Sequence, residues 1–111
     1  MRNIDSLKNT SQFRDVYENG SSVANKLLVL YIKKTESGKK LGISVSKKVG
    51  NSVVRHRTIR LIRESFLSVK EDLSDGITLV VVARPAAAGK KQNEVTEAFL
   101  HLCRLKHILK H

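Results

Sequence analysis

Basic residues are concentrated in one stretch of the sequence, from Ser37 to Arg63, which contains no acidic residue. Its cationic members are Lys39, Lys40, Lys47, Lys48, Arg55, Arg57, Arg60 and Arg63. A solvated helix usually mixes signs, because opposite charges four residues apart stabilise it by roughly 0.2–0.5 kcal/mol. This stretch lacks that support, and its like charges repel one another. The pattern therefore indicates that an external anion neutralises these side chains.

The second half of this stretch has the spacing of a long amphipathic helix. Asn51 or Ser52 can cap its start, and the helix is expected to run to about Val69. At about 100° per residue, one narrow apolar stripe faces the core. The stripe consists of Ile59, Ile62, Phe66 and Val69. The helix can therefore bury one side and still present basic side chains to solvent.

The basic side chains of this helix follow their own spacing. His56, Arg60 and Arg63 lie at i, i+4 and i+7, with Arg57 further round and Arg55 at the helix entrance. Guanidinium groups bind phosphate oxygens bidentately, and a helix N-terminus adds partial positive charge. The loop before the helix brings further donors to the same end. The predicted phosphate-binding residues are Lys47, Lys48, Asn51, Arg55, His56, Arg57, Arg60 and Arg63.

A second candidate surface is the outward face of a predicted antiparallel hairpin, with strands at 27–34 and 41–47. Alternation turns one set of side chains to the core and places Tyr31 outside, near small and hydroxyl residues of the neighbouring strand. Such a trough suits the stacking of single-stranded bases. Its predicted lining is Phe13, Tyr17, Tyr31, Ser44 and Ser46. The residues alone equally allow Tyr31 to be an ordinary surface tyrosine and Phe13 to be core.

The remaining elements complete a small α+β sandwich. A first helix, capped by Thr10 or Ser11, ends at Asn19-Gly20. Residues 77–83 are apolar on both faces and are expected in the middle of the sheet. A last helix is expected from about Asn93 to Leu109. The sequence thus predicts a single domain, residues 1–111, with the order α-β-β-β-α-β-α and a mixed four-stranded sheet.

The charge balance narrows the class of partner. Twenty-one Lys and Arg against ten Asp and Glu give a formal net charge of +11 and a pI near 10.2. Such a field favours nucleic acid or an anionic membrane. A membrane surface is not expected, because the basic helix has no exposed apolar face to insert. The N-terminus has no apolar signal region, and the longest apolar run is too short to span a bilayer. A soluble, cytoplasmic protein is expected.

No catalytic constellation is visible in the sequence. The acidic residues are scattered, and His56, His101, His107 and His111 form no nucleophile or metal-ligand pattern. Cys103 is the only cysteine, so a disulfide framework and a cysteine zinc site are excluded. We expect no catalytic residue, no metal site in the protein alone and no protein partner. The residues thus indicate an RNA-binding protein, with a DNA-binding regulator as a weaker alternative.

The central segment, residues 41–64, resembles the signature of the protein component of bacterial ribonuclease P. Phe13-Arg14-Asp15-Val16-Tyr17 with Gly20 is similar to the family's first helix, and Val80-Val81-Val82-Ala83-Arg84 to its last strand. The resemblance covers nearly the whole chain. It implies an accessory subunit of an RNA enzyme that removes the 5′ leader of precursor tRNA, with Mg²⁺ used by the RNA. It also implies a left-handed βαβ crossover, against the general rule.

The resemblance assigns roles to both surfaces. The arginines of the helix would contact the catalytic RNA, and the cleft of Phe13, Tyr17, Tyr31 and Ser44 would hold the single-stranded leader. Two positions depart from the family pattern, since His56 replaces the usual Asn and Ile59 the usual Lys. Ile59 is expected to strengthen core packing instead. The alternative is a ribosomal or general RNA-binding structural protein. Leader preference, affinity and oligomeric state are not encoded visibly.

Overall fold

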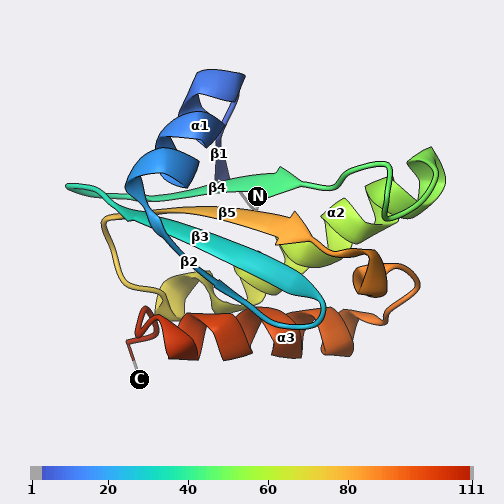
Figure 1. The fold of residues 1–111 in the computed structure, drawn as a ribbon. Coiled ribbons are helices and arrows are strands. Elements are labelled where there is room, and N and C mark those ends of the chain that lie inside the picture. Colours follow the sequence, from blue (N-terminus) through green and yellow to red (C-terminus); the bar gives the residue numbers. More distant parts are fainter. Residues whose placement is uncertain (1–3, 111) are drawn as a thin grey trace.

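A five-stranded sheet divides the chain into two layers, as the computed structural model shows for residues 4–110 (Figure 1). The residues Met1–Asn3 and His111 lie outside the described part. The strands are β1 (Asp5–Ser6), β2 (Ser21–Ala24), β3 (Leu28–Lys34), β4 (Lys39–Ser44) and β5 (Ile77–Ala83). The helices are α1 (Thr10–Asn19), α2 (Ser52–Val69) and α3 (Gln92–Leu105), with short 3₁₀ turns η1 (Lys70–Asp72) and η2 (Pro85–Ala87). Helix α1 covers one face of the sheet, and α2 with α3 covers the other.

Strand β5 occupies the centre of the sheet, as its apolar sequence predicts. The strand order is β1-β4-β5-β3-β2, and β5 pairs antiparallel with β3 and parallel with β4. Leu79 and Val81 belong to the main core under α2 and α3, whereas Val80 is buried on the opposite face. An apolar strand covered on both faces avoids exposing either set of side chains. The predicted mixed sheet and α+β class are confirmed.

The predicted hairpin between residues 27–34 and 41–47 is wrong. Strand β5 lies between β3 and β4, and the hairpin partner of β3 is the short strand β2. The turn after β3 closes onto the start of β5 instead, where Thr35 N–H donates to the Gly76 carbonyl at 2.8 Å. Strand β5 is apolar on both faces and occupies the most buried position in the sheet. It therefore separates β3 and β4, which follow one another in the sequence. A fifth strand, β1, was also missed, because two residues are too few for an alternating pattern.

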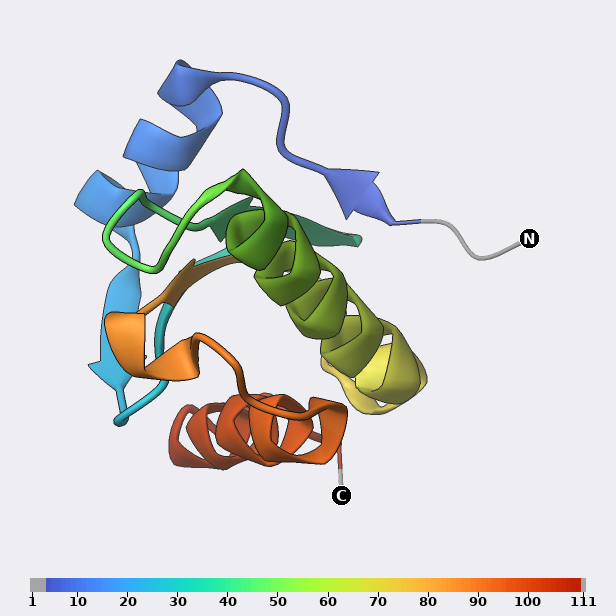
Figure 2. The same cartoon turned by 90° about the vertical axis from the view of Figure 1, so that its right-hand side faces the viewer.

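Strands β4 and β5 are parallel neighbours joined through α2. In Figures 1 and 2 the chain leaves β4, returns beneath the sheet through α2 and enters β5 on the side of β3. This path turns in the left-handed sense, as the resemblance implies. The long helix therefore lies under the β4 edge, and its outer side faces away from α3.

Helix α2 begins where the sequence predicts, with the Asn51 side chain accepting from Val54 N–H at 3.0 Å. Its core-facing stripe is shifted from the predicted one: Ile62 and Phe66 are buried, and so are Thr58 and Ser65. The Thr58 and Ser65 hydroxyls donate hydrogen bonds of 2.8 Å to the Val54 and Leu61 carbonyls. Both buried hydroxyls therefore have a hydrogen-bond partner. Ile59 is half-buried and lies outside the main core, so its expected core role is wrong.

The other two helices differ from prediction at their ends. Asn9 caps α1, in place of Thr10 or Ser11, and forms a capping box with Gln12. Helix α3 ends at Leu105, four residues before the predicted end, because His107 adopts a positive φ of 55° and reverses the chain. Ile108 is nevertheless buried, and its carbonyl accepts from Ser74 N–H at 2.7 Å. Within residues 4–110, no helix is both long and apolar enough to cross a membrane.

Candidate nucleic-acid interface

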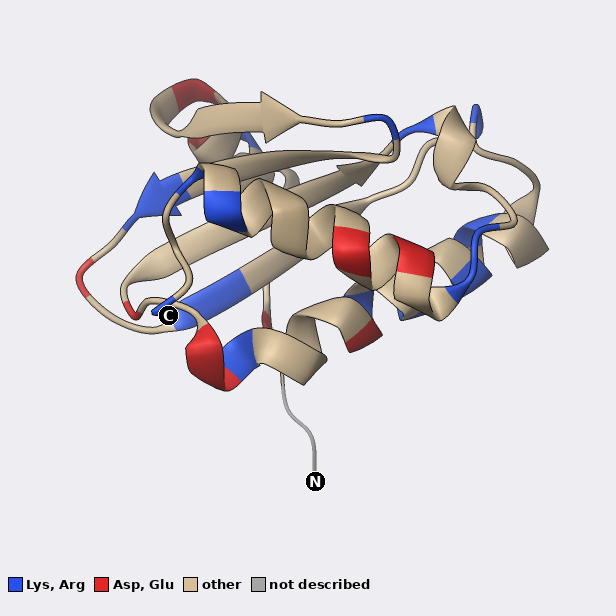
Figure 3. Ribbon diagram, turned by 90° about the horizontal axis from the view of Figure 1, so that it is seen from below, with Lys and Arg blue, Asp and Glu red and all other residues tan. Residues whose placement is uncertain are grey.

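The outer side of α2 carries a row of exposed basic side chains. His56, Arg60 and Arg63 are exposed, and Arg63 lines a small pocket at the β4 edge together with Leu7 and Phe13. The row thus reaches the edge of the sheet that separates the two layers. Lys47 and Lys48 are exposed in the loop before α2 (Figure 3), where buried Val49 donates its N–H to the Ser46 carbonyl at 3.1 Å. The loop is anchored by an apolar residue and presents its lysines outward.

Three of the predicted phosphate-binding residues are held by, or partly buried in, the protein itself. The Asn51 side-chain oxygen caps α2. Arg55 is half-buried, and its Nε is inaccessible to solvent and has no hydrogen-bond partner among the described residues. Arg57 is exposed on the side facing α3, and its Nη1 donates to the Lys90 carbonyl at 2.9 Å. The eight predicted residues therefore lie in the first two thirds of α2 and in the loop before it, but not on a single face.

On the opposite layer, three aromatic rings meet where α1 crosses the sheet. The centroids of Phe13 and Tyr17 are 6.4 Å apart, and those of Tyr17 and Tyr31 are 4.7 Å apart in an edge-to-face arrangement. Gly42 allows this approach, since a Cβ there would lie 2.8 Å from the Phe13 ring. Tyr17 remains 39% exposed. Phe13 and Tyr17 form the wall of a groove, and Tyr17 is the most exposed of the three rings.

The groove beside these rings has a volume of about 410 Å³. Its lining residues are Lys8, Asn9, Thr10, Phe13, Tyr17 and Ser44. Strand register extends the floor across the sheet, because Ser44 is paired with Val82 and Val82 with Val29. Phe13, Tyr17 and Ser44 thus lie where the sequence predicts, while Tyr31 supports Tyr17 from the neighbouring strand. Ser46 lies beyond the end of β4, outside this lining.

Sequence reasoning missed three lining residues at the start of α1: Lys8 and Asn9, which precede the helix, and Thr10, its first residue. The helix cap could have revealed them, because the residues at the start of a helix lie at its exposed end. The pairing of Val82 with Ser44 and Val29 was missed, because the sequence did not predict that β5 lies between β3 and β4. Lys8 is the one basic residue in the lining of the groove.

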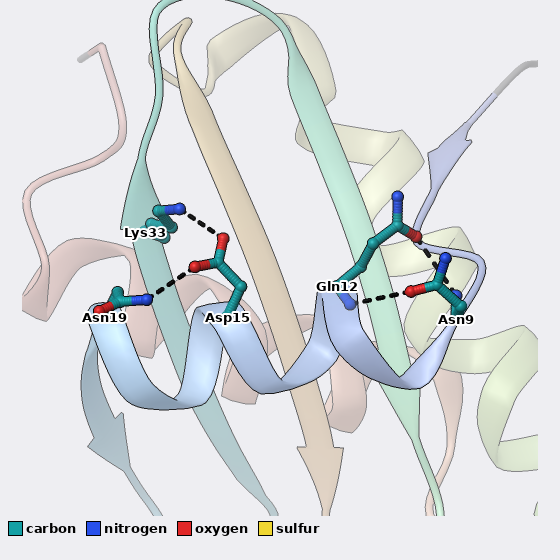
Figure 4. A network of polar contacts seen from close by, with 5 residues as sticks. All are labelled: Asn9, Gln12, Asp15, Asn19 and Lys33. Carbon is teal, nitrogen blue, oxygen red and sulfur yellow. Dashed lines mark hydrogen bonds and ion pairs between the residues drawn. The ribbon is translucent and has the colours of Figure 1, made fainter.

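Helix α1 is fixed on β3 by a polar network (Figure 4). Asp15 forms an ion pair with Lys33, and Asn19 donates to the other Asp15 oxygen at 2.7 Å. These two hydrogen bonds hold the pKa of the Asp15 carboxyl below its ordinary value, the bond from Lys33 contributing most. Asp15 and Lys33 each lie two residues from a ring of the Tyr17–Tyr31 pair. The network therefore sets where the wall of the groove stands.

Within residues 4–110, no three His, Cys, Asp or Glu side chains come together in a group that could hold a metal ion. Burial raises the pKa of the Cys103 thiol to about 12, so this thiol is not a nucleophile near neutral pH. The two surfaces offer phosphate-binding cations on one layer and aromatic edges on the other.

Comparisons with known proteins agree on one family. The model of the family described as "Ribonuclease P" matches residues 1–106. A ribonuclease P protein component of Lachnoclostridium phytofermentans is 53% identical over 95% of this chain and 91% of its own. One from Brevibacillus brevis is 42% identical over 94% and 84%. The solved Staphylococcus aureus RNase P protein superposes with a TM-score of 0.87 at 30% identity, covering 96% of this chain and 99% of its own.

Proposed function

Because the chain belongs to the ribonuclease P protein family, we propose that its two surfaces have separate tasks within the ribonuclease P holoenzyme. The chain is the protein component of this tRNA-processing endoribonuclease, and ribonuclease P RNA is its partner. The alternative of a ribosomal or general RNA-binding protein is set aside by the family match over residues 1–106. The proposal concerns which residues contact which RNA.

The basic surface of α2 contacts the catalytic RNA. Arg60 and Arg63 are exposed on the side of α2 away from α3. Charge-assisted hydrogen bonds from guanidinium to phosphate are the strongest polar contacts such a surface can make. Lys47, Lys48, Asn51, Arg55, His56 and Arg57 complete the surface around the start of the helix. Neutralising these charges removes repulsion that the free protein carries.

The groove beside α1 contacts the single-stranded 5′ leader of precursor tRNA. The observation that supports this assignment is the exposed Tyr17 ring, which packs against Tyr31 at a centroid distance of 4.7 Å and lines the groove together with Phe13 and Ser44. A rigid aromatic wall stacks on any unpaired base, so it accepts leaders of varied sequence. Lys8 at the rim supplies a cation for the leader backbone.

Mg²⁺ belongs to the RNA in this proposal. The described residues of the protein do not fit a metal site of their own, since their carboxylates and imidazoles form no group of three or more. The protein therefore contributes binding and positioning, and the bond cleavage is carried out by the RNA. The holoenzyme acts in the cytoplasm, where its tRNA precursors are made.

The test is reconstitution of the holoenzyme. Addition of the protein to its catalytic RNA should stimulate removal of the 5′ leader from precursor tRNA at low Mg²⁺ concentration. The protein alone, with Mg²⁺ and free of RNA, should leave the same substrate intact. Specific 5′ cleavage by the protein alone, or no stimulation of the RNA, would contradict the proposal.

A further inference from the structure

A second pocket lies on the flank of α1 that is turned away from the aromatic groove. It has a volume of about 210 Å³. At about 100° per residue, Gln12 and Asp15 lie on a different side of α1 from Phe13 and Tyr17. Figure 4 shows Gln12, Asp15 and Lys33 together on this flank, where α1 crosses the strands. The lining residues are Leu7, Gln12, Asp15, Val16, Lys33, Thr35, Lys40 and Thr78.

The sheet side of this pocket is a row of three polar residues on neighbouring strands. Thr78 on β5 is paired in register with Lys33 on β3 and with Lys40 on β4. Residues that are directly opposite in a sheet share one face, and all three of these residues line the pocket beside α1. The sheet therefore places one hydroxyl between two ammonium groups.

The Thr78 hydroxyl is buried without a protein partner. Thr78 is 6% exposed, and its side chain forms no hydrogen bond with any residue that the structure describes. The other buried polar residues behave differently, because the Thr58 and Ser65 hydroxyls each donate to a helix carbonyl at 2.8 Å. Among the described residues, Arg55 Nε is the one unpaired side-chain polar atom that solvent cannot reach, so the Thr78 hydroxyl is reachable from the pocket. It needs a partner from outside the chain.

Lys40 supplies the charge of the pocket. It is exposed, and within residues 4–110 its side chain has no ion pair or hydrogen bond, although Asp5 is paired with it in register on β1. Lys33 is ion-paired with Asp15, but an ammonium group has three N–H donors, and the ion pair uses only one of them. Both Asp15 oxygens are occupied, since they accept from Lys33 and Asn19. One positive charge therefore remains uncompensated.

Gln12 adds a further donor. Its side-chain oxygen accepts from the Lys8 and Asn9 N–H groups, and its NH₂ group is directed away from Asn9 in Figure 4. This NH₂ group has no hydrogen bond to the part of the chain that the structure describes. The carboxylate and amide oxygens that line the pocket are thus already used, and the groups left open are mainly donors. Such a set suits an anion with several acceptor oxygens.

We propose that this pocket binds one phosphate group, held by Lys40, Gln12 and Thr78 with Lys33 at its side. The phosphate is either a free phosphate anion or one carried by an RNA strand, because both present the same acceptor oxygens. The pocket is separate from both surfaces described above. It lies on a different flank of α1 from the groove and on the opposite face of the sheet from α2. Binding here does not depend on the roles proposed for those surfaces.

The first experiment titrates the full-length protein with inorganic phosphate at constant ionic strength and follows its NMR signals. The backbone amides of Lys40 and Thr78 and the Gln12 side-chain NH₂ should shift along one saturable curve. Thr78→Val keeps the shape of the side chain and removes the hydroxyl, so it should weaken phosphate binding roughly 10-fold, as expected for a lost hydrogen bond to a charged group. Lys40→Ala should weaken it at least as much.

The matched control is Lys34→Ala. Lys34 is the next residue on β3 after Lys33, is exposed and points to the other face of the sheet, so its removal should leave the curve unchanged. Thr78→Val should melt at the same or a higher temperature than the parent protein, because an unpaired buried hydroxyl is lost. A curve that does not saturate, or equal phosphate binding by Thr78→Val and the parent protein, would overturn the proposal.

The second experiment identifies the carrier of the phosphate in the reconstituted holoenzyme. It compares the parent protein with Thr78→Val for binding of the catalytic RNA, of mature tRNA and of precursor tRNA with leaders of increasing length. A loss of affinity that appears only with longer leaders assigns the phosphate to the leader, and weaker binding of the catalytic RNA assigns it to that RNA. Unchanged RNA affinities, together with saturable binding of inorganic phosphate, assign the pocket to a free anion.

Discussion

Tyr17 on α1 and Tyr31 on β3 meet edge to face, with 4.7 Å between their ring centroids and planes inclined by 75°. This contact supports the partly exposed Tyr17 ring against a second ring on the sheet. A side chain that is already held in place loses little conformational entropy when a base stacks on it. The pair is the part of the groove on which leader binding should depend most strongly.

Tyr31→Ala should weaken binding of precursor tRNA to the holoenzyme and leave mature tRNA, which has no leader, unaffected. The expected cost is about 1–3 kcal/mol, the usual value of one base–aromatic stacking partner. The measurement is the ratio of precursor to mature affinity for the reconstituted enzyme. Tyr17→Ala should behave alike, and assembly with the catalytic RNA should not change. A ratio equal to that of the parent protein, with the variant folded, would show that the leader runs elsewhere.

Arg60→Ala and Arg63→Ala should each weaken binding of the catalytic RNA by about 1–3 kcal/mol. Each should also reduce the magnitude of the salt slope by up to about one unit. Folding should be unaffected, because both side chains are exposed on the outer side of α2. Arg104→Ala is the matched control, since Arg104 is exposed in the last turn of α3. Equal binding by all three variants over a salt series would exclude α2 as the RNA-binding surface.

Asp15→Asn should lower the midpoint of thermal unfolding at neutral pH and, by loosening α1, reduce the precursor-to-mature ratio. The folded-state pKa of Asp15 is depressed by Lys33 and Asn19, so the ionised carboxyl stabilises the fold above its unfolded pKa of about 3.9. That stability is lost as the pH falls through the lower folded value. The difference in midpoint between the two proteins should therefore shrink below about pH 4. A difference that stays constant with pH would mean that the ion pair contributes nothing.

His107→Gly should stabilise the protein by about 1 kcal/mol in urea unfolding. His107 has a φ of 55°, a conformation that glycine adopts without strain and that other residues adopt at a cost. Its side chain is exposed, so little packing is lost. His107→Ala is the control, because it removes the imidazole and keeps the strain. Equal stability of the two variants would show that backbone conformation is not the cause.

Local signals in the sequence were enough to predict α2, α1 and the central position of β5. The Asn51 cap, the burial of Ile62 and Phe66 and the doubly apolar run at 77–83 depend on residues close in sequence and were found as expected, whereas Ile59 lies outside the core. Errors arose where distant segments decide the outcome. The pairing of β3 with β5 and the contact of Arg57 with Lys90 join residues far apart in the chain. Spacing along one segment holds no information about such partners.

For the candidate site, residue types were predicted better than their surroundings. Phe13, Tyr17 and Ser44 share the groove because the first two lie one helical turn apart on α1 and strand alternation turns Ser44 to the same face of the sheet. The half-buried state of Arg55 could not be read from its position at the helix entrance, because it depends on where the loop and sheet lie around it. The same holds for Arg57, whose contact with the Lys90 carbonyl depends on where the chain before α3 lies beside α2.

The central place of β5 also governs when this protein can fold during its synthesis. Strands β3 and β4 leave the ribosome first, yet each must wait for residues 77–83 before it gains its main partner. Until then the edges of β3 and β4 that later pair with β5 can pair with other nascent chains. The sheet consequently assembles as a whole late in translation, and its long-range pairings slow that assembly. A chain truncated before residue 77 contains most of the proposed RNA-binding residues but not the central strand that joins the β2–β3 pair to the β1–β4 pair.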